Sequence, residues 1–538
     1  MNQDWYTCLD DGWATLRRAL APLRGRDLDE IQVQLYKHSF NFANLASAAH
    51  LVEEFNRRDD QNTLDYQLSG EIVSHWLADC LRVLDENVRS YSDDTAGLND
   101  QSLKYIRAIC SPNRVKLVHE MLERLDGQIP WDTIDAEKDA MRMSIRKFSD
   151  DVVAPVAEDI HRNDQMIPPQ ILDGVRELGC FGFSVPMEYG GLKPGDGEDT
   201  TGMVVVTEEL SRGSLGAAGS LITRPEIIVR ALLEGGTEEQ RRRWLPGLAA
   251  GEPLCAVSVT EPNTGSDVAS VALSARKTEG GWLLNGEKTW CTFAGKAGLI
   301  LVLARTDRDA TPPHRGLSLF VIEKPSTDDH EFTVESPGGG IMSGRAIPTL
   351  GYRGMHSFSM HYDDYFVPDD ALVGEEGGLN RGFYYTMRGF SGGRLQTAAR
   401  AVGLMQAAFE AAYVYAGDRL VFNRAIRSYP LTQSKLINMM TAIVTIRRYS
   451  YAVATLMDRN EGQLEASLVK LIACRAAESV TREALQIHGG MGYAEETPVS
   501  RYFVDARVLS IFEGAEETLA LKVVGRALFD EIEKRVLN

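Results

Sequence analysis

The sequence predicts an α+β chain that is mainly α-helical, with a β domain in its middle. Two observations lead to this prediction. Apolar residues recur at helical spacing before residue 250 and after residue 374, and short β-branched runs fill the stretch between them. Helices, then strands, then helices are typical of a segregated architecture and not of alternating βαβ units. At 538 residues the chain is too long for one compact core, so two or more domains are expected.

The first two domains are predicted to be helical. Residues 1–130 form an N-terminal helical region, in which Leu35, Phe42 and Leu45 fall at helical spacing. Pro130 restricts the residue before it, which predicts a linker there. A second helical domain is expected to follow over residues 134–250.

The middle domain is predicted over residues 251–373. Its apolar runs are separated by Gly, Asp and Pro, a pattern that predicts strands of an antiparallel sheet or small barrel. The runs cover residues 256–259, 282–284, 299–303 and 317–322. From residue 374 to 538 the helical periodicity returns, which predicts a C-terminal helical bundle.

The composition excludes several classes of protein. A net charge of −19 argues against nucleic acid or an anionic membrane as the main partner. Seven scattered cysteines without a Cys-x-x-Cys pair argue against a zinc site or a disulfide framework and favour a reducing compartment. The acidic first twenty residues argue against a secretory signal, and no apolar run is long enough to span a membrane. We therefore expect a cytoplasmic protein.

Residues 511–514, Ile-Phe-Glu-Gly, carry the candidate catalytic group, Glu513. A carboxylate among apolar neighbours is desolvated, which raises its pKa toward the range of a base near neutral pH. Alone the motif is weak, because any exposed Glu before Gly gives the same letters. Three other segments strengthen the assignment of Glu513. Residues 259–267 read VTEPNTGSD, residues 285–292 read NGEKTWCT, and residues 486–493 form a glycine-rich loop.

The 259–267, 285–292 and 511–514 segments, in this order and at these separations, resemble the acyl-CoA dehydrogenase family. The resemblance runs from about residue 134 to the end of the chain. It implies a helical domain, a central β-barrel or sheet domain and a C-terminal four-helix bundle, here with an extra N-terminal helical region. It also implies FAD as the cofactor and oxidation of an acyl-CoA thioester to the trans-2-enoyl-CoA, with electrons passed to electron-transferring flavoprotein.

The resemblance implies that the middle domain contacts the flavin ring and the pyrophosphate. Trp290 would lie at the ring face, and the Thr292 hydroxyl would be directed toward flavin N5. Glycine lets the backbone approach such a ligand, and loop N–H groups can bond it. The cofactor residues implied here are Val257, Val259, Thr260, Gly265, Ser266, Trp290 and Thr292. The alternatives are a plain hairpin turn and a core tryptophan on a strand. Phe293 stands where the family usually has Asn.

The resemblance implies further cofactor contacts in the C-terminal bundle. These are Arg419, Phe422, Gln433, Gln486, Gly489 and Gly490. In the family the arginine that Arg419 matches reaches the pyrophosphate of a neighbouring subunit's cofactor. Its planar guanidinium can donate to two phosphate oxygens at once. Asn423 replaces the usual Gly, and the gap to Gln433 is longer than usual. A solvated arginine and a glycine pair that ends a helix are the alternatives.

Glu513 is the predicted base for the thioester α-proton. Some family members place their base immediately before the residue that Arg394 matches, but Gly393 stands there. Glu516 and Glu517 are predicted to be charges at a helix N-terminus. In the family, the backbone N–H of the catalytic Glu and a flavin hydroxyl stabilise the developing enolate.

The chain length and the N-terminal region are similar to those of family members that act on branched, carboxylated short acyl groups such as 2-methylsuccinyl-CoA. Gly393 leaves space for a branched substrate. A second carboxylate needs a cation, for which Arg224, Arg345 and Arg353 are candidates, with a surface arginine as the alternative for each. Ser266, Arg394 and Gly514 are the other expected substrate contacts.

Two other functions stay open. An acyl-CoA oxidase would keep every motif and differ only in how oxygen reaches the reduced flavin. A non-dehydrogenating member of the fold would be expected to lack the base and to carry a basic patch, and the net charge of −19 argues against it. The N-terminal region is expected either to cover a bundle face, favouring a homodimer over a tetramer, or to bind a partner.

Overall fold

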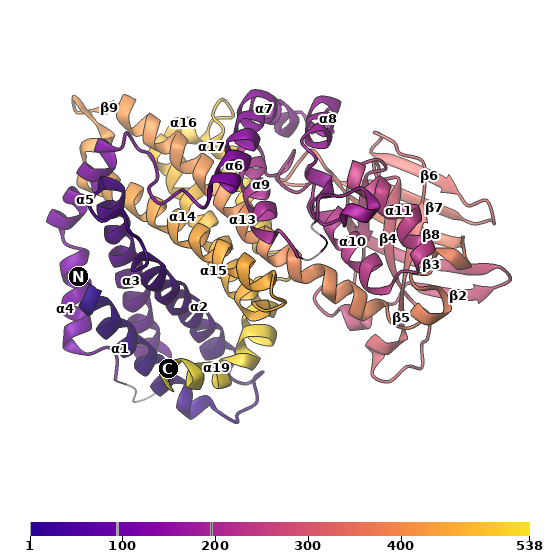
Figure 1. Cartoon of the computed structure of the whole chain (residues 1–538), viewed down its shortest axis with the longest axis horizontal. Helices are drawn as coiled ribbons and strands as arrows, with labels where there is room; N and C mark the ends of the chain where they lie inside the picture. Colours follow the sequence, from indigo (N-terminus) through magenta and orange to yellow (C-terminus); the bar gives the residue numbers. More distant parts are fainter. Residues whose placement is uncertain (1, 93–95, 194, 196, 538) are drawn as a thin grey trace. The chain divides into compact units, whose positions relative to one another are not determined.

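The protein was analysed as a computed structural model that describes residues 2–92, 96–193, 195 and 197–537. The chain divides into two compact units, Met1–Ala140 with Thr397–Asn538, and Met141–Gln396. The predicted α+β fold is confirmed: the chain is mainly helical, with a sheet in its middle and helices before residue 135 (Figure 1). None of the helices in the described ranges has the combination of length and apolar character needed to cross a membrane.

The first unit joins both ends of the chain. Its helices are α1 (Asn2–Leu20), α2 (Gln32–Phe55), α3 (Leu64–Tyr91), α4 (Asp100–Ile109), α5 (Pro112–Arg124), α14 (Pro430–Met457), α15 (Gln463–His488), α16 (Gly490–Tyr493), α17 (Val499–Leu509), α18 (Glu516–Thr518) and α19 (Gly525–Leu537). A π-helical segment, Leu519–Val524, precedes α19, and the short strands β9 (Leu420–Val421) and β10 (Arg424–Ala425) form a hairpin.

The N-terminal helices pack on the C-terminal bundle within this unit. α2 and α3 lie beside α14, and α2 also contacts α15 (Figure 1). Arg448 of α14 donates to Glu54 of α2 at 2.9 Å and to the Thr133 carbonyl at 2.8 Å. Its guanidinium lies 5.4 Å from the Trp131 ring centroid. The region that sequence reasoning separated as an extension therefore shares a core with the bundle.

The second unit contains the remaining helices and the sheet. Its helices are α7 (Ala154–Arg162), α8 (Pro169–Glu177), α9 (Thr200–Gly213), α10 (Thr223–Gly235), α11 (Glu238–Ala250) and α12 (Glu375–Gly378), while α6 (Ala136–Phe148) and α13 (Gly382–Asp418) have residues in both units. Its strands are β1 (Cys255–Ser258), β2 (Ser274–Thr278), β3 (Gly281–Thr292), β4 (Leu299–Arg305), β5 (Leu317–Glu323), β6 (Glu331–Glu335), β7 (Ile341–Ile347) and β8 (Ser357–Pro368).

The strands form one sheet in the order β1-β4-β2-β3-β8-β7-β6, with β5 paired to β4. β1 runs parallel to β4, with Ala256 opposite Ile300, and β2 also meets β4 in parallel, so the antiparallel pairing expected for these strands does not hold at these two contacts of β4. The reason lies in the connection. The chain leaves β1, forms the β2–β3 hairpin and returns in β4, and a connection of this length can bring a strand back in the same direction.

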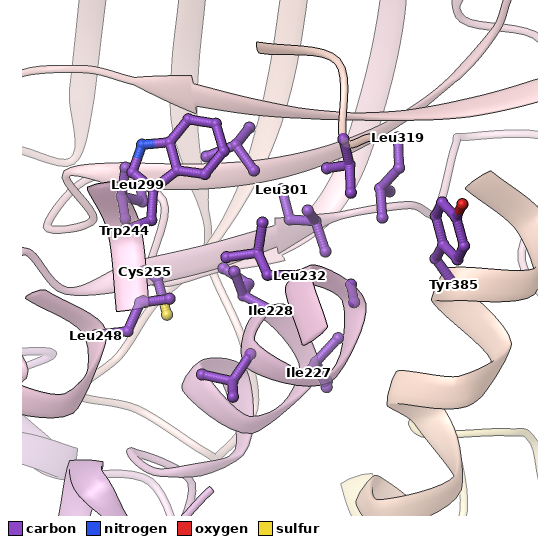
Figure 2. Close-up of a cluster of buried hydrophobic side chains, with 14 of the residues drawn as sticks. Ile227, Ile228, Leu232, Trp244, Leu248, Cys255, Leu299, Leu301, Leu319 and Tyr385 are labelled. Carbon is purple, nitrogen blue, oxygen red and sulfur yellow. The ribbon is translucent and has the colours of Figure 1, made fainter. Parts of the chain in front are cut away.

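Helices α10 and α11 cover one face of β1, β4 and β5 (Figure 2). Ile228 and Leu232 of α10 and Trp244 of α11 point into this cluster, opposite Leu301 of β4. Burial of each such side chain contributes about 1.5–3 kcal/mol. The cluster therefore holds β1 firmly, and β1 leads directly into the first of the predicted site loops.

Candidate active site

A buried ion pair joins the two motifs of the middle domain. Lys288 is fully buried, and its ammonium donates to the Glu261 carboxylate and to the Val259 carbonyl, each at 2.9 Å. Glu261 also accepts the N–H groups of Ala272 and Leu273, each at 2.8 Å. Burial lowers the pKa of Lys288 to about 8, against the opposing effect of Glu261. Sequence reasoning assigned neither residue a role.

Part of the loop after β1 has its backbone accessible to a ligand. The Thr260 carbonyl accepts the Thr289 N–H at 2.8 Å, and residues 261–264 close a tight turn with two backbone hydrogen bonds of 2.9 and 3.1 Å. Gly265 and Ser266 follow and are exposed. A Cβ on Gly265 would meet only the Thr260 methyl, at 3.9 Å. The turn that was the alternative prediction is present, and it leaves room for a ligand beside it. Val257 and Val259 lie half-buried and buried at the base of this loop.

Trp290 is not a core residue. It has a φ of 58°, it lies where the β3–β8 pairing is interrupted, and its exposed fraction is 55%. Two residues later, the Thr292 and Ser357 hydroxyls lie 2.9 Å apart and share one hydrogen bond. A hydroxyl has one donor and two acceptor sites, so Thr292 retains capacity for a ligand. Phe293, in place of the family's Asn, is buried.

Two of the predicted cofactor residues lie at the β9–β10 hairpin, Phe422 in its turn and Arg419 just before β9. Phe422 and Asn423 form its two-residue turn with φ values of 51° and 62°, a conformation that Asn adopts more readily than most residues. This explains why Asn can replace the family's Gly. Phe422 is 89% exposed at the tip. Arg419 is also exposed, and no acidic partner faces it within the described chain.

The predicted glycine pair lies near this hairpin. The ring of Tyr415, just before the hairpin, stacks on His488 of α15 at 4.3 Å. Gly489 and Gly490 follow His488, and a Cβ on either would have no atom within 4 Å. Gln486 is exposed beside them. These positions border open surface, as a cofactor site requires. Gln433 is half-buried in the first turn of α14.

The Glu513 turn is held in an unusual backbone conformation. Glu513 and Gly514 have φ values of 54° and 98°. The fully buried Lys470 of α15 donates to the Phe512 carbonyl at 2.7 Å and to the Gly514 carbonyl, so it ties together the carbonyls of the two residues that flank Glu513. Arg400 lies 5.0 Å over the Phe512 ring. Sequence reasoning missed Lys470, although a single Lys in an apolar helical run was a signal.

One carboxylate oxygen of Glu513 has no partner. Oε2 is buried and makes no hydrogen bond to any residue that the structure describes. The Glu513 N–H likewise donates to no backbone carbonyl in the described ranges. A buried polar atom without a partner costs about 1–3 kcal/mol, and functional sites are a recurrent explanation of such atoms. The turn thus offers an acceptor for a proton and a donor for an oxygen.

The three candidate arginines for a substrate carboxylate differ in their partners. Arg345 is exposed on β7 and pairs with Glu331 of β6 at 2.9 Å, as a surface arginine would. Arg224 of α10 is half-buried and donates to the Ser220 carbonyl at 2.8 Å and to the Tyr352 hydroxyl at 3.2 Å. It also contacts the Met355 sulfur at 3.7 Å; all three partners are neutral, and no carboxylate faces Arg224 among the described residues. Of the three candidates, Arg224 is thus the one without a carboxylate partner in the described chain.

Arg353 already has an acidic partner. Its guanidinium lies 3.5 Å from the Asp164 carboxylate and donates to the His161 carbonyl at 2.8 Å. Asp164, His330 and His356 also bring three possible metal-ligand atoms within 4.8 Å of one another. Arg353 supplies positive charge to this same Asp164 carboxylate. Arg394, the remaining predicted substrate contact, is half-buried in α13.

Three family models match the chain in order. They are the acyl-CoA dehydrogenase N-terminal domain over residues 135–252, the middle domain over 256–365 and the C-terminal domain over 380–529. Residues 1–134 lie outside all three.

Known proteins agree with these matches. The chain is 42% identical to (2S)-methylsuccinyl-CoA dehydrogenase of Cereibacter sphaeroides over 74% of the chain and 70% of that relative. It is 34% identical to the mitochondrial 2-methylacyl-CoA dehydrogenase of Solanum tuberosum over 74% of the chain and 91% of that relative. Butyryl-CoA dehydrogenase from Megasphaera elsdenii matches in structure with a TM-score of 0.66 at 28% identity, covering 74% of the chain and 99% of that protein.

Proposed function

The chain belongs to the acyl-CoA dehydrogenase family, and we propose that it oxidises a branched, carboxylated short acyl-CoA with Glu513 as the base. Members of the family are FAD-dependent oxidoreductases, and FAD is the cofactor of this chain. When bound, FAD supplies the acceptor for the hydride that leaves the substrate β-carbon. The observation that carries the proposal is the unpartnered, buried Oε2 of Glu513 on its fixed turn.

Glu513 takes the α-proton of the thioester in this proposal. An α-proton is only weakly acidic, so the thioester oxygen needs a preorganised donor while negative charge develops on it. The Glu513 N–H is suited to this role because it has no backbone acceptor in the described chain. Lys470 bonds the Phe512 carbonyl, which belongs to the same peptide as the Glu513 N–H, and the Gly514 carbonyl, so it holds the backbone on which Glu513 stands.

The residues present fit FAD. Trp290 offers an exposed aromatic face, and the Thr292 hydroxyl retains hydrogen-bonding capacity. Arg419, exposed and without an acidic partner in the described ranges, suits a phosphate. Gly265, Gly489 and Gly490 border open space that a side chain would fill. We propose these residues, with Val257, Val259, Thr260, Ser266, Phe422, Gln433 and Gln486, as the cofactor contacts.

We propose 2-methylsuccinyl-CoA as the substrate, on two grounds. A relative with 42% identity is a (2S)-methylsuccinyl-CoA dehydrogenase, and Arg224 offers a half-buried cation for a second carboxylate. The decisive test is an anaerobic titration of the holoenzyme with 2-methylsuccinyl-, isobutyryl-, butyryl- and glutaryl-CoA while the flavin band is followed. Preferential bleaching by 2-methylsuccinyl-CoA supports the proposal. A flavoprotein that no thioester bleaches would refute it and favour a non-dehydrogenating role.

Replacing Arg224 with methionine should raise the KM for 2-methylsuccinyl-CoA about 10- to 100-fold and leave the KM for butyryl-CoA nearly unchanged. A hydrogen bond to a charged group contributes about 1.5–3 kcal/mol, and each 1.4 kcal/mol changes affinity tenfold. The measurement is steady-state kinetics with both thioesters. Arg345→Met is the matched control, because Arg345 pairs with Glu331 on an exposed surface. An equal rise in KM for both thioesters would show that Arg224 does not bind the second carboxylate of the substrate.

We also propose that electrons pass to electron-transferring flavoprotein and that the enzyme works in the cytoplasm. All seven cysteines are free thiols, as is typical of a reducing compartment. The acceptor is tested by reoxidising the substrate-reduced enzyme with that flavoprotein or with oxygen alone. Equally fast reoxidation by oxygen would favour the acyl-CoA oxidase alternative.

We propose a homodimer, because α2 and α3 cover faces of α14 and α15 that are then closed to other subunits. Light scattering of the holoenzyme should give twice the chain mass of 59.5 kDa. A tetramer mass would contradict this proposal without affecting the chemistry.

A further inference from the structure

Helix α2 of the N-terminal region contacts the segment that follows Glu513. Tyr36 of α2 donates its phenolic hydroxyl to the Glu516 carboxylate, and Arg475 of α15 donates to the Tyr36 oxygen. Arg475 also bonds Glu516 directly, at 2.9 and 3.1 Å. Glu516 is the first residue of α18 and follows Glu513 by three positions. One side chain of α2 therefore fixes the residue at which the catalytic turn ends.

A second contact lies one helical turn further along α2. The buried Ser39 hydroxyl donates to the Ala520 carbonyl at 2.7 Å, inside the π-helical segment Leu519–Val524. Near the end of this segment, Leu35 packs so closely on Gly525 that a Cβ there would lie 2.8 Å from it. Positions 35, 36 and 39 share one face of a helix. That face of α2 follows the chain from Glu516 to Gly525.

Glu516 and Tyr36 each keep one protonation state at neutral pH. Burial disfavours the ionised form of Glu516, but hydrogen bonds from Arg475 and Tyr36 outweigh it and hold the pKa of Glu516 below its ordinary value. Burial and the bond to Glu516 raise the pKa of Tyr36 to about 12. A lowered carboxylate pKa contributes stability that is present above the ordinary value and is lost as the pH falls through the folded-state value. Glu516 is thus an acceptor and Tyr36 a donor throughout the neutral range.

We infer that the N-terminal helical region positions the catalytic base, with Tyr36 and Ser39 as positioning residues for the Glu513 turn. This inference rests on the proposed function, because it takes Glu513 to be the base. Lys470 holds the turn from α15, and α2 holds the chain that leaves it. Residues 1–134, which lie outside the family models, are in this view a structural part of the active site.

The kinetic test uses Tyr36→Phe and Ser39→Ala, alone and together. Each removes one hydroxyl and keeps the helix. We expect the double variant to lose about 10- to 100-fold in kcat for 2-methylsuccinyl-CoA, because small misplacements of a catalytic group can cost this much. KM and flavin content should stay within about twofold of the parent. Tyr66→Phe is the matched control, because the Tyr66 hydroxyl makes no hydrogen bond among the described residues of the same region. Unchanged kcat in the double variant would overturn the inference.

A second measurement separates this inference from the identity of the base. Hydrogen exchange of the holoenzyme is followed in the peptide that covers residues 509–525. We expect at least about tenfold faster exchange there in Tyr36→Phe/Ser39→Ala and no change in Tyr66→Phe. Unchanged exchange would overturn the inference. If Glu513→Gln kept full turnover, the proposed function would fail, while the exchange result would still decide whether α2 holds this segment.

Discussion

Replacing Glu513 with glutamine is expected to lower the rate of acyl-CoA dehydrogenation about 10²–10⁴-fold, the range that a positioned general base contributes. Glutamine has nearly the size of glutamate and can adopt the same φ of 54°, so the Lys470 bridge to the flanking carbonyls stays intact. The amide, however, cannot take the α-proton. The measurement is the anaerobic rate of flavin bleaching after mixing with 2-methylsuccinyl-CoA.

Glu517→Gln is the matched control for this experiment. Glu517 lies four positions along the same segment and is exposed, whereas one oxygen of Glu513 is buried. The control should bleach at the parent rate. Substrate binding by Glu513→Gln, followed as a shift of the flavin spectrum without bleaching, should persist. A loss of less than about tenfold in Glu513→Gln would show that another group is the base.

Replacing Lys288 with methionine is expected to destabilise the middle domain by about 3–5 kcal/mol. Methionine fills a similar volume, but it leaves the Glu261 carboxylate buried without its cation, and removal of one partner of a buried pair carries a cost of this size. The Val259 carbonyl also loses its donor. The loop that leads to Thr260 should therefore loosen as well, with weaker retention of flavin. Urea unfolding followed by tryptophan fluorescence measures the shift in midpoint.

Two variants control this prediction. Lys277→Met removes a lysine of the same sheet that pairs with Asp369 on the surface, and it should cost less than about 1 kcal/mol. Glu261→Gln/Lys288→Met removes both charges and should recover much of the lost stability, because the buried charge is gone. If the effects of Glu261→Gln alone and Lys288→Met alone simply added in the double variant, the ion pair would not be the source of the stability.

Much of the fold followed from local patterns in the sequence. Helical periodicity at both ends and short β-branched runs in the middle predicted the α+β architecture, because side chains repeat every 3.6 residues in a helix and every second residue in a strand. Local patterns also located the turn at Glu513, the glycine pair at 489–490 and the loop at 259–267. The special backbone angles at Glu513 and Gly514 are consistent with a turn at that motif.

Only the tertiary structure decided how these segments support one another. The Lys288–Glu261 pair joins residues 27 positions apart, Lys470 reaches the Gly514 carbonyl across 44 positions, and Tyr36 meets Glu516 across 480. Periodicity reports which face of an element is buried and not which distant residue it meets. For the same reason the sequence predicted three equivalent arginines, whereas the fold gave Arg345 and Arg353 acidic partners and left Arg224 with neutral ones.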